Sequence, residues 1–514
     1  MSIASSWSST QLASQLIMPR LNTDSFFTDS VYRKSIEDLV LMGIGGFCIF
    51  DGNTETALQM TELLQAIAPI PLIFSSDFEY GLPMRLTEGT SFPHAMAIGR
   101  TNEPSNAYLI GQAIAKEALS VGVNWNFAPV CDINSNKLNP IINIRSYGET
   151  PEIVSRFSAE FIKGTQEKSV AACAKHFPGH GDTETDSHLA LPVLKKTIQE
   201  LSQLELKPFH NAVQNGVWSV MIGHLALPAI DDSHKPASLS SSIINILRQD
   251  LNFEGLIVTD ALDMKAVIDN YPIDEIAYMA LNAGNDIALM PLNPIDSIKF
   301  MADKIDSDNN LKRKLENSAE RFYNLKRKCG LIPQFAKPHL HNQIFSDHLS
   351  KALKIAHKSV VLDGNINLLP IPNDVKIAVY AILQTDHDLQ SGNRFFTMLA
   401  QAVENDCDFA FIDSSIIDEH IQGFLDGTEE AELIIFAVFI KSVSFIGSVQ
   451  LEENLRNAIT KLSAGKKTII VLFGNPYLSE ALKYDLLIST FSDSFASLAA
   501  SVIYLSDRND ALNY

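Results

Sequence analysis

One segment of the sequence, KHFPGHGDTETDSHLALP at residues 175–192, concentrates side chains that could transfer protons. Asp186 and His188 lie two residues apart in it, so the carboxylate can hydrogen-bond one imidazole nitrogen and leave the other free to exchange protons. Because histidine has a reference pKa of about 6.5, such a pair can donate and then accept a proton near neutral pH. The spacing predicts an acid–base dyad in which Asp186 orients His188.

The same segment also has the residue types of a metal site. A zinc ion would take its ligands from His176, His180, Asp182 and His188. The HxxxH spacing lies across a Pro-Gly pair and cannot be helical, so we expect no metal ion. A solvated turn without a function is less favoured still, because three of the chain's 13 histidines fall within thirteen residues. No GxGxxG or GxxxxGKS/T motif follows a predicted strand, and we expect no cofactor.

Charged residues follow several other apolar runs at the point where each run ends. They are Asp77, Glu79 and Arg85 after 73–76, Asp132 and Arg145 after 124–129, Lys175 and His176 after 171–174, His224 after 217–222, and Asp260 after 257–259. In a parallel α/β barrel these ends meet at one face, where active sites form. Taken singly, Arg85 and Arg145 could be surface charges, and His224 is more often structural. Asp260 could be an N-cap for the segment beginning at Ala261.

The elements that must position these residues alternate along the chain from about residue 35 to 295. Short apolar runs rich in β-branched residues are predicted strands, and amphipathic stretches between them are predicted helices. The strands are 45–50, 71–76, 123–129, 170–176, 218–223, 256–259 and 286–290, and the helices include 54–67, 105–121, 151–167, 198–215 and 273–283. Seven or eight such units predict an α/β fold, a (β/α)₈ barrel with helices outside a parallel sheet.

A second domain is predicted after a long helical segment at 308–329. The stretch LIPQFAKPHLHNQ has two prolines and no clear periodicity, and we place a linker at 336–345. The pattern then restarts, with predicted strands at 359–362, 377–381, 409–412, 433–438, 468–473 and 486–489. We therefore predict a barrel domain over 1–335 and a smaller α/β sandwich domain over 346–514.

The composition is that of a globular chain, with 46% hydrophobic and 19% charged residues. Forty Lys and Arg against 60 Asp and Glu give a net charge of −20, so neither nucleic acid nor an anionic membrane is an expected partner. Five scattered cysteines without a CxxC pair indicate buried thiols in a reducing compartment. The sequence shows no signal peptide and no apolar run of the roughly 18 residues that a membrane span needs. We expect a cytoplasmic enzyme; the oligomeric state is not predicted.

At these residues the sequence resembles glycoside hydrolase family 3, and within it the β-N-acetylglucosaminidase (β-hexosaminidase) branch. The KHFPGHG…DSH loop is a specific signature of that branch. Supporting motifs occur in the family's order: DFEYGLPMR at 77–85, NFAPVCD at 126–132, NIRSYG at 143–148, LIVTDALDM at 256–264 and AGNDIALMP at 283–291. The resemblance covers most of residues 10–330, while SVVLDGNINLLPI and VLFGNPY weakly resemble the family's second domain.

The resemblance implies a retaining, exo-acting β-N-acetylglucosaminidase that hydrolyses terminal β-linked GlcNAc. Asp260 would be the nucleophile that forms a covalent glycosyl-enzyme. His188, oriented by Asp186, would protonate the leaving oxygen and later activate water. The hydroxyls of the sugar would be bound by Asp77, Arg85, Arg145, Lys175 and His176. The implied substrate is a small carbohydrate, a GlcNAc–MurNAc fragment of the cell wall that is being recycled.

The sequence departs from the family in two places. The usual Asp-x-Glu-Gly-Gly reads Asp77-Phe-Glu-Tyr80-Gly81, so a bulky ring replaces a glycine near the sugar. The second domain is short and divergent, and no catalytic residue is carried over from it. Two other functions stay open: a phosphorylase on the same scaffold, because a neutral imidazole does not repel phosphate, and a non-catalytic sugar-binding protein.

Overall fold

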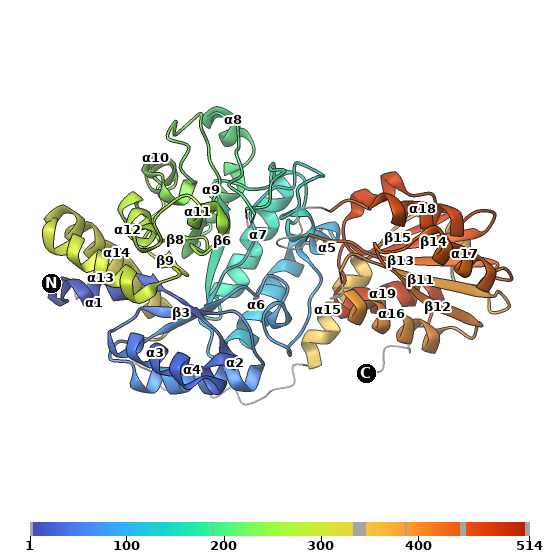
Figure 1. Cartoon of the computed structure of the whole chain (residues 1–514), viewed down its shortest axis with the longest axis horizontal. Coiled ribbons are helices and arrows are strands. Elements are labelled where there is room, and N and C mark those ends of the chain that lie inside the picture. The colour runs from blue at the N-terminus through green and yellow to red at the C-terminus, as the bar shows by residue number, and fades with distance from the viewer. Residues whose placement is uncertain (1–3, 188, 333–345, 386–387, 443–448, 509–514) are drawn as a thin grey trace. The chain divides into compact units, whose positions relative to one another are not determined.

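The computed structural model describes residues 4–187, 189–332, 346–385, 388–442 and 449–508. The chain folds into two compact units (Figure 1). The first unit comprises residues 1–90, 104–136 and 149–345. The second comprises residues 91–103, 137–148 and 346–514, so two short segments from the first half of the sequence belong to it.

The first unit is built on a parallel sheet with helices outside it (Figure 1). Seven strands pair in sequence order, namely β2 (Arg20–Leu21), β3 (Gly46–Ile49), β4 (Ile73–Ser76), β5 (Trp125–Asn126), β6 (Ala171–Phe177), β7 (Ser219–Ile222) and β8 (Leu256–Thr259). β1 (Ile17–Met18) pairs with β9 (Ala288–Leu289), and a bridge joins Val258 to Ile287. The ladder therefore continues from β8 through β9 to the first strand. The predicted α/β barrel fold is confirmed.

The first strand of the barrel is absent from the sequence prediction, which begins at about residue 35. β1 and β2 lie on either side of Pro19, which has no N–H to donate to a ladder. The Pro19 carbonyl still accepts a hydrogen bond from the Cys48 N–H at 3.0 Å, so the pairing with β3 is kept. Two pieces of two residues each are too short to show a period of two.

Helices cover the outside of the barrel. Their bounds are α1 (Ser9–Gln15), α2 (Thr23–Thr28), α3 (Ser30–Leu41), α4 (Thr54–Ile67), α6 (Pro104–Ser120), α7 (Pro151–Gln166), α8 (Ile198–Gln203), α9 (Leu206–Gln214), α10 (Ser241–Asn245), α11 (Lys265–Ile268), α12 (Ile273–Ala283), α13 (Pro294–Ser307) and α14 (Asn309–Lys328). The start of α7 has a local cause: Thr150 accepts a hydrogen bond from the Ile153 N–H, and Pro151 occupies the first turn. Phe157 and Phe161 then fall on one buried face, so the helix packs inward.

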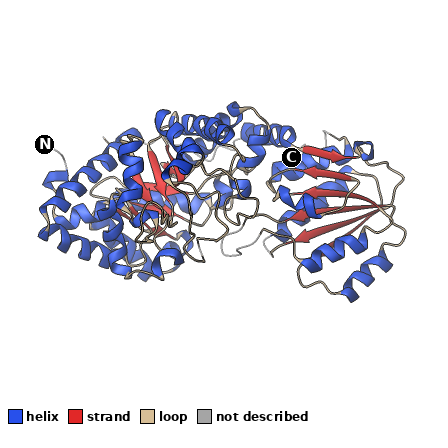
Figure 2. Cartoon of the chain, turned by 90° about the horizontal axis from the view of Figure 1, so that it is seen from above, coloured by secondary structure: helices blue, strands red, loops and turns tan. Residues whose placement is uncertain are grey.

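The second unit is a six-stranded sheet with helices beside it (Figure 2). The strand order is β10-β15-β14-β13-β11-β12, and only β10 is antiparallel to its neighbour. The bounds are α15 (Ser346–Ser359), β10 (Val361–Gly364), β11 (Ile377–Leu383), α16 (Leu389–Ala402), β12 (Cys407–Ile412), α17 (Asp418–Gly427), β13 (Leu433–Phe439), α18 (Glu453–Leu462), β14 (Lys467–Leu472), β15 (Leu486–Ser489) and α19 (Phe495–Ser506). Val379 packs in a core with α16 and α19, and its neighbour Tyr380 packs on the opposite face with α17 and α18. The predicted second α/β domain is confirmed.

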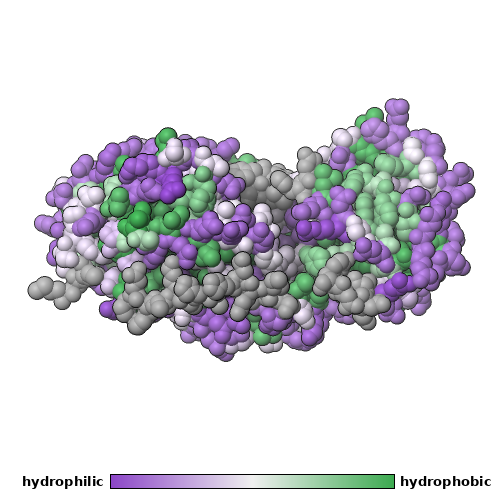
Figure 3. All heavy atoms as spheres, turned by 90° about the horizontal axis from the view of Figure 1, so that it is seen from below, coloured by the Kyte–Doolittle hydropathy of each residue, from purple (hydrophilic) through white to green (hydrophobic). Residues whose placement is uncertain are grey.

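The surface of the protein is largely polar on the face shown in Figure 3, where hydrophilic residues (purple) surround patches of apolar ones (green). Such a surface accords with the net charge of −20. Within the described ranges, no helix combines the length and the apolar character needed to cross a lipid bilayer.

Lys326, near the end of α14, is fully buried at the amino ends of the barrel strands. Its ammonium donates to Gln15 Oε1 at 3.0 Å and lies 4.6 Å from the centre of the Phe322 ring. The Gln15 amide in turn donates to the carbonyls of Gly43 and Ile44, just before β3. Burial lowers the pKa of Lys326 to about 7, because desolvation disfavours the charged form.

This burial makes the stability of the first unit depend on pH. Between pH 7 and about 10.4 the unfolded lysine binds a proton that the folded one does not, so stability rises with pH in this window and changes little below it. Lys326→Met should remove this dependence, so the slope of the free energy of unfolding against pH should fall by about 1 kcal/mol per pH unit between pH 7.5 and 9.5. All three tryptophans, Trp7, Trp125 and Trp218, lie in the first unit, so their fluorescence during urea unfolding measures it.

The matched control is Lys299→Met, which removes an exposed lysine of α13. The control should leave the slope of stability against pH as it is in the parent chain. Equal slopes in the parent chain and in Lys326→Met would contradict the burial argument.

Candidate active site

A buried ion-pair cluster lies where β4 and β6 end. Lys175 of β6 places its Nζ 2.7 Å from Asp77 Oδ1 and 2.8 Å from Glu79 Oε1. Arg85, which follows the 3₁₀ helix η2 (Leu82–Met84), donates to Asp77 Oδ2 at 2.8 Å. The structure therefore brings together three of the predicted sugar-binding residues, and the Lys175 side chain is only 2% exposed.

The charges of this cluster support one another. Burial alone would raise the pKa of Asp77, but the positive charges of Lys175 and Arg85 outweigh it and hold that pKa well below its usual range. Asp77 is therefore an ionised acceptor at neutral pH, placed between two charged donors. Short charged groups fixed at strand ends are suited to binding hydroxyl groups by charge-assisted hydrogen bonds.

Asp132 organises the turn that follows β6. Its fully buried carboxylate accepts hydrogen bonds from His176 Nδ1 at 2.7 Å and from the His180 N–H at 2.7 Å. Burial opposes the ionisation of Asp132, but the interaction with His176 outweighs it and lowers the pKa of that carboxyl. Burial lowers the pKa of His180 to about 4, so its imidazole is neutral at pH 7. Asp132 thus sets the orientation of the predicted sugar-binding residue His176.

Asp260 directly follows β8. Its N–H donates to the Ile222 carbonyl of β7 at 2.8 Å, and its Oδ1 accepts from the Ala261 N–H at 2.8 Å. The next helix is α11, whose N-cap is Met264, so the interpretation of Asp260 as a helix cap is wrong. The Asp260 carboxylate is held in the turn at the end of the strand.

The predicted nucleophile and the Asp77 cluster lie at the same face of the barrel. The Asp260 N–H is bonded to the end of β7, and β7 pairs with β6, the strand that carries Lys175. Both groups therefore follow or end strands at the carboxyl ends of the parallel sheet, where active sites of such barrels form.

His224, after β7, has the bonding of a structural histidine. The residue is fully buried, with Nδ1 2.7 Å from Ser238 Oγ and Nε2 2.9 Å from the Ala261 carbonyl. Its second bond holds the residue that follows Asp260. His224 therefore supports the turn of the predicted nucleophile.

The predicted acid–base dyad is described only in part. Asp186 is buried, and its carbonyl accepts from the N–H groups of Leu189 and Ala190 at 2.9 and 3.0 Å. His188 lies outside the described residues. The pairing of Asp186 with His188 stays a prediction.

Arg145 belongs to the second unit and ends the 3₁₀ helix η3 (Asn143–Arg145). Its guanidinium donates to the Ile141 carbonyl at 3.0 Å. The preceding residue, Ile144, packs in a small apolar cluster with Met96 and Ala97 of α5 (Ala95–Arg100) and with Phe491. Arg145 is thus the one predicted sugar-binding residue that the structure places outside the first unit.

Four residues of this region are missing from the predicted site. Glu79 and Asp132 were noted as following strands, but only the structure shows that they hold Lys175 and His176. Arg20 was not noted, and Phe50 was noted only as the last residue of the predicted strand 45–50. The one sequence signal for Phe50 was its position at the end of an apolar run, and a search restricted to charged residues overlooks it.

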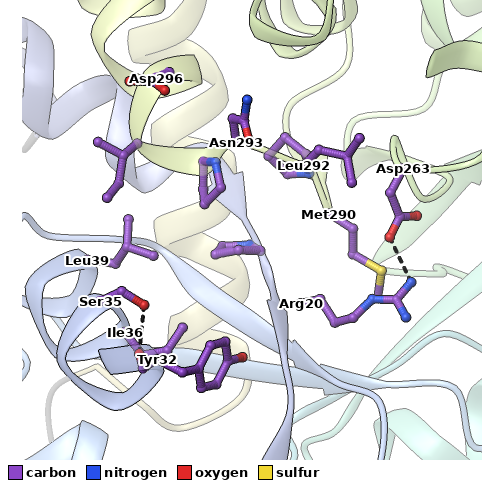
Figure 4. Close-up of a pocket in the computed structure, with 14 residues that line it drawn as sticks. Arg20, Tyr32, Ser35, Ile36, Leu39, Asp263, Met290, Leu292, Asn293 and Asp296 are labelled. Atoms are coloured by element: carbon purple, nitrogen blue, oxygen red, sulfur yellow. Dashed lines mark hydrogen bonds and ion pairs between the residues drawn. The ribbon is translucent and has the colours of Figure 1, made fainter. Parts of the chain in front are cut away.

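A cavity of about 460 Å³ lies beside Arg20 in the first unit. Its walls combine apolar side chains of α3 and of residues 290–295 with the polar side chains of Tyr32, Ser35, Asn293 and Asp296, and Arg20 with Asp263 lies at one end (Figure 4). None of the predicted site residues lines it. Among the described residues, no three or more His, Cys, Asp or Glu are grouped so as to hold a metal ion. One residue of the alternative zinc set, His188, lies outside those residues.

Comparison with known proteins gives the family. The model of the glycosyl hydrolase family 3 N-terminal domain matches residues 11–325. The chain belongs to glycosyl hydrolase family 3. A family 3 β-N-acetylglucosaminidase from Paenibacillus sp. str. FPU-7 has a solved structure that covers 97% of this chain and 96% of its own, with a TM-score of 0.84 and 26% identity.

Sequence relatives support the same branch of family 3. The β-hexosaminidase A of Pseudoalteromonas piscicida is 34% identical over 325 residues, 57% of this chain and 54% of that protein, so the chain spans about half of its length. The β-N-acetylglucosaminidase/β-glucosidase of Cellulomonas fimi is 27% identical over 487 residues, 88% of this chain and 84% of that protein. The predicted membership of family 3 and the resemblance to its β-hexosaminidases are confirmed, and with them the class of glycoside hydrolase.

The role of Asp132 in this family 3 site can be tested by Asp132→Asn. The amide has the same shape but loses the charge, and its NH₂ group faces donors of His176 and His180. We expect a loss of about 2–4 kcal/mol in the free energy of unfolding of the first unit, followed by tryptophan fluorescence in urea.

The control for this variant is Asp182→Asn, in the same loop. Asp182 is partly exposed and pairs with Lys196, so its change should stay within about 0.5 kcal/mol. Similar losses in the two variants would show that Asp132 does not organise the turn.

Proposed function

We propose that this chain is an exo-acting, retaining β-N-acetylglucosaminidase that hydrolyses terminal, non-reducing β-linked GlcNAc. The single observation that carries the proposal is the cluster of Asp77 with Lys175 and Arg85, whose buried charges are fixed at strand ends. A sugar ring presents hydroxyls that can both donate and accept, and this cluster offers a charged acceptor between charged donors. The names of the relatives support GlcNAc as the sugar.

In the proposed mechanism, Asp260 attacks the anomeric carbon and the bond to the aglycone oxygen breaks. His188, oriented by Asp186, gives its proton to the departing oxygen. A covalent glycosyl–Asp260 intermediate results, and water, deprotonated by His188, then releases the sugar with its configuration retained. His176, Lys175, Asp77, Arg85 and Arg145 would bind the hydroxyls of the sugar and stabilise the oxocarbenium-like transition state.

We also propose that the natural substrates are GlcNAc–MurNAc fragments derived from peptidoglycan, which the resemblance to the family's β-N-acetylglucosaminidase branch implies. A cytoplasmic location belongs to the same proposal, because the resemblance implies a substrate that is being recycled and the five scattered cysteines indicate a reducing compartment. The acidic surface accords with a small, soluble substrate rather than a nucleic acid.

The activity is tested by incubating the protein with 4-nitrophenyl β-GlcNAc and with 4-nitrophenyl β-glucoside, each with and without inorganic phosphate. We expect release of free GlcNAc, unchanged by phosphate. Sugar 1-phosphate as the product would assign a phosphorylase, and preference for the glucoside would assign a β-glucosidase. No turnover of either substrate, together with binding of GlcNAc, would assign a sugar-binding protein.

The role of the nucleophile predicts the effect of Asp260→Asn. Without a carboxylate to form the covalent intermediate, kcat for 4-nitrophenyl β-GlcNAc should fall by at least ~10³-fold. Binding of free GlcNAc, measured by calorimetry, should change much less. A variant with most of its activity would rule out Asp260 as the nucleophile.

The role of the acid predicts that His188→Ala depends on the leaving group. A nitrophenolate departs without a proton, whereas a sugar aglycone needs one, so hydrolysis of the β-linked GlcNAc disaccharide should slow by about 10²- to 10⁴-fold and cleavage of the bond to the aryl group far less. His210→Ala, an exposed histidine of α9, is the control and should leave both rates unchanged. Equal losses of kcat/KM, which reports cleavage of the bond to the aglycone, on the two substrates would exclude His188 as the acid.

A further inference from the structure

The ring of Phe50 lies between two guanidinium groups. Phe50 follows β3 and is half-buried at the carboxyl end of the barrel. The guanidinium carbon of Arg85 lies 3.9 Å from the centre of its ring, and that of Arg20 lies 4.0 Å from the same centre. Both distances are well inside the range of about 6 Å over which a cation interacts with an aromatic face.

Each guanidinium is also held by its own carboxylate. Arg85 donates to Asp77 at 2.8 Å, and Arg20 donates to Asp263 Oδ2 at 2.7 Å (Figure 4). The five side chains form a continuous series, Asp77–Arg85–Phe50–Arg20–Asp263, which we call the mouth series. It runs from the end of β4, past β3 and β2, to the turn after β8.

The two ends of the mouth series lie at the parts of the proposed site whose relative position must stay fixed: the sugar ligands and the nucleophile. At one end are Asp77 and Arg85, both proposed ligands of the sugar. At the other end is Asp263, three residues after the proposed nucleophile Asp260 in the same turn. A guanidinium is planar, and a ring packed against it limits how that plane can turn, so its N–H groups stay directed at a carboxylate and at a hydroxyl together.

We propose that Phe50 and Arg20 are positioning residues of the glycosidase site. Phe50 fixes the plane of the Arg85 guanidinium for the sugar, and Arg20 ties this support to the turn that carries Asp260. The inference rests on the proposed function, because it takes Arg85 as a sugar ligand.

The first test is the variant Phe50→Leu beside the conservative variant Phe50→Tyr. Leucine keeps apolar volume but has no aromatic face, so kcat/KM for 4-nitrophenyl β-GlcNAc should fall by about five- to thirtyfold, mainly through KM. Tyrosine keeps the face and should stay within about twofold of the parent chain. Phe300→Leu, a half-buried ring of α13 with Lys304 4.8 Å from its centre, is the matched control and should leave kcat/KM unchanged.

A double-mutant cycle with Arg85→Met separates positioning from a general structural effect. If Phe50 acts through Arg85, Phe50→Leu should cause no further loss once Arg85 is methionine. An equal loss in both backgrounds, or a loss in Phe50→Tyr as large as in Phe50→Leu, would overturn the inference.

Arg20→Met tests the other half of the mouth series. It should lower kcat/KM by about three- to tenfold in the parent chain and by much less in Phe50→Leu, since the support it gives passes through the ring. An unchanged kcat/KM in Arg20→Met would remove Arg20 from the proposal.

The activity of the parent chain tests the proposed function separately. If the parent chain hydrolyses 4-nitrophenyl β-GlcNAc and Phe50→Leu has the same kcat/KM, only the inference about Phe50 is overturned. If the parent chain binds GlcNAc without turnover, the same comparisons are made on the dissociation constant from calorimetry. A parent chain that neither cleaves nor binds GlcNAc overturns both.

Discussion

The ion pairs of Asp77 with Lys175 and Arg85 are the interaction on which the site depends. Lys175 reaches from β6 past β5 to a carboxylate after β4, so it fixes strand ends that are not neighbours in the sheet. Moving a charge from water into the protein interior has a large free-energy cost, which a close partner of opposite sign offsets. Each member of the cluster therefore needs its partners in order to stay charged in the interior. The same charges would bind the hydroxyls of a sugar in the proposed site.

The alternation of apolar runs with amphipathic stretches was enough to predict the barrel and the second sheet. Runs such as 433–438 are continuous because both faces of the strand are buried, and β13 is buried along its whole length. The failures are local. β1 and β2 have two residues each on either side of a proline, and no periodicity can be read from such pieces.

From the sequence, a site residue could be predicted only if it directly follows or ends a predicted strand and if that position is enough to suggest its role. Asp77, Lys175 and Asp260 satisfy that rule. Asp132 does too, but its role depends on which donors surround its carboxylate, and two of them come from His176 and His180, more than forty residues later. A contact between a ring and a guanidinium, as between Phe50 and Arg85, leaves no mark in the spacing of residues.

The inclusion of α5 and η3 in the second unit limits how the chain can be divided. Met96, Ala97 and Ile144 share a small core with Phe491, which lies more than 340 positions after Ile144 in the sequence. A cut between residues 332 and 346 would separate these side chains from the partner that covers them. The second unit therefore cannot be exchanged between relatives as one continuous C-terminal segment. To conserve this core, recombination would have to exchange residues 91–103, 137–148 and 346–514 together.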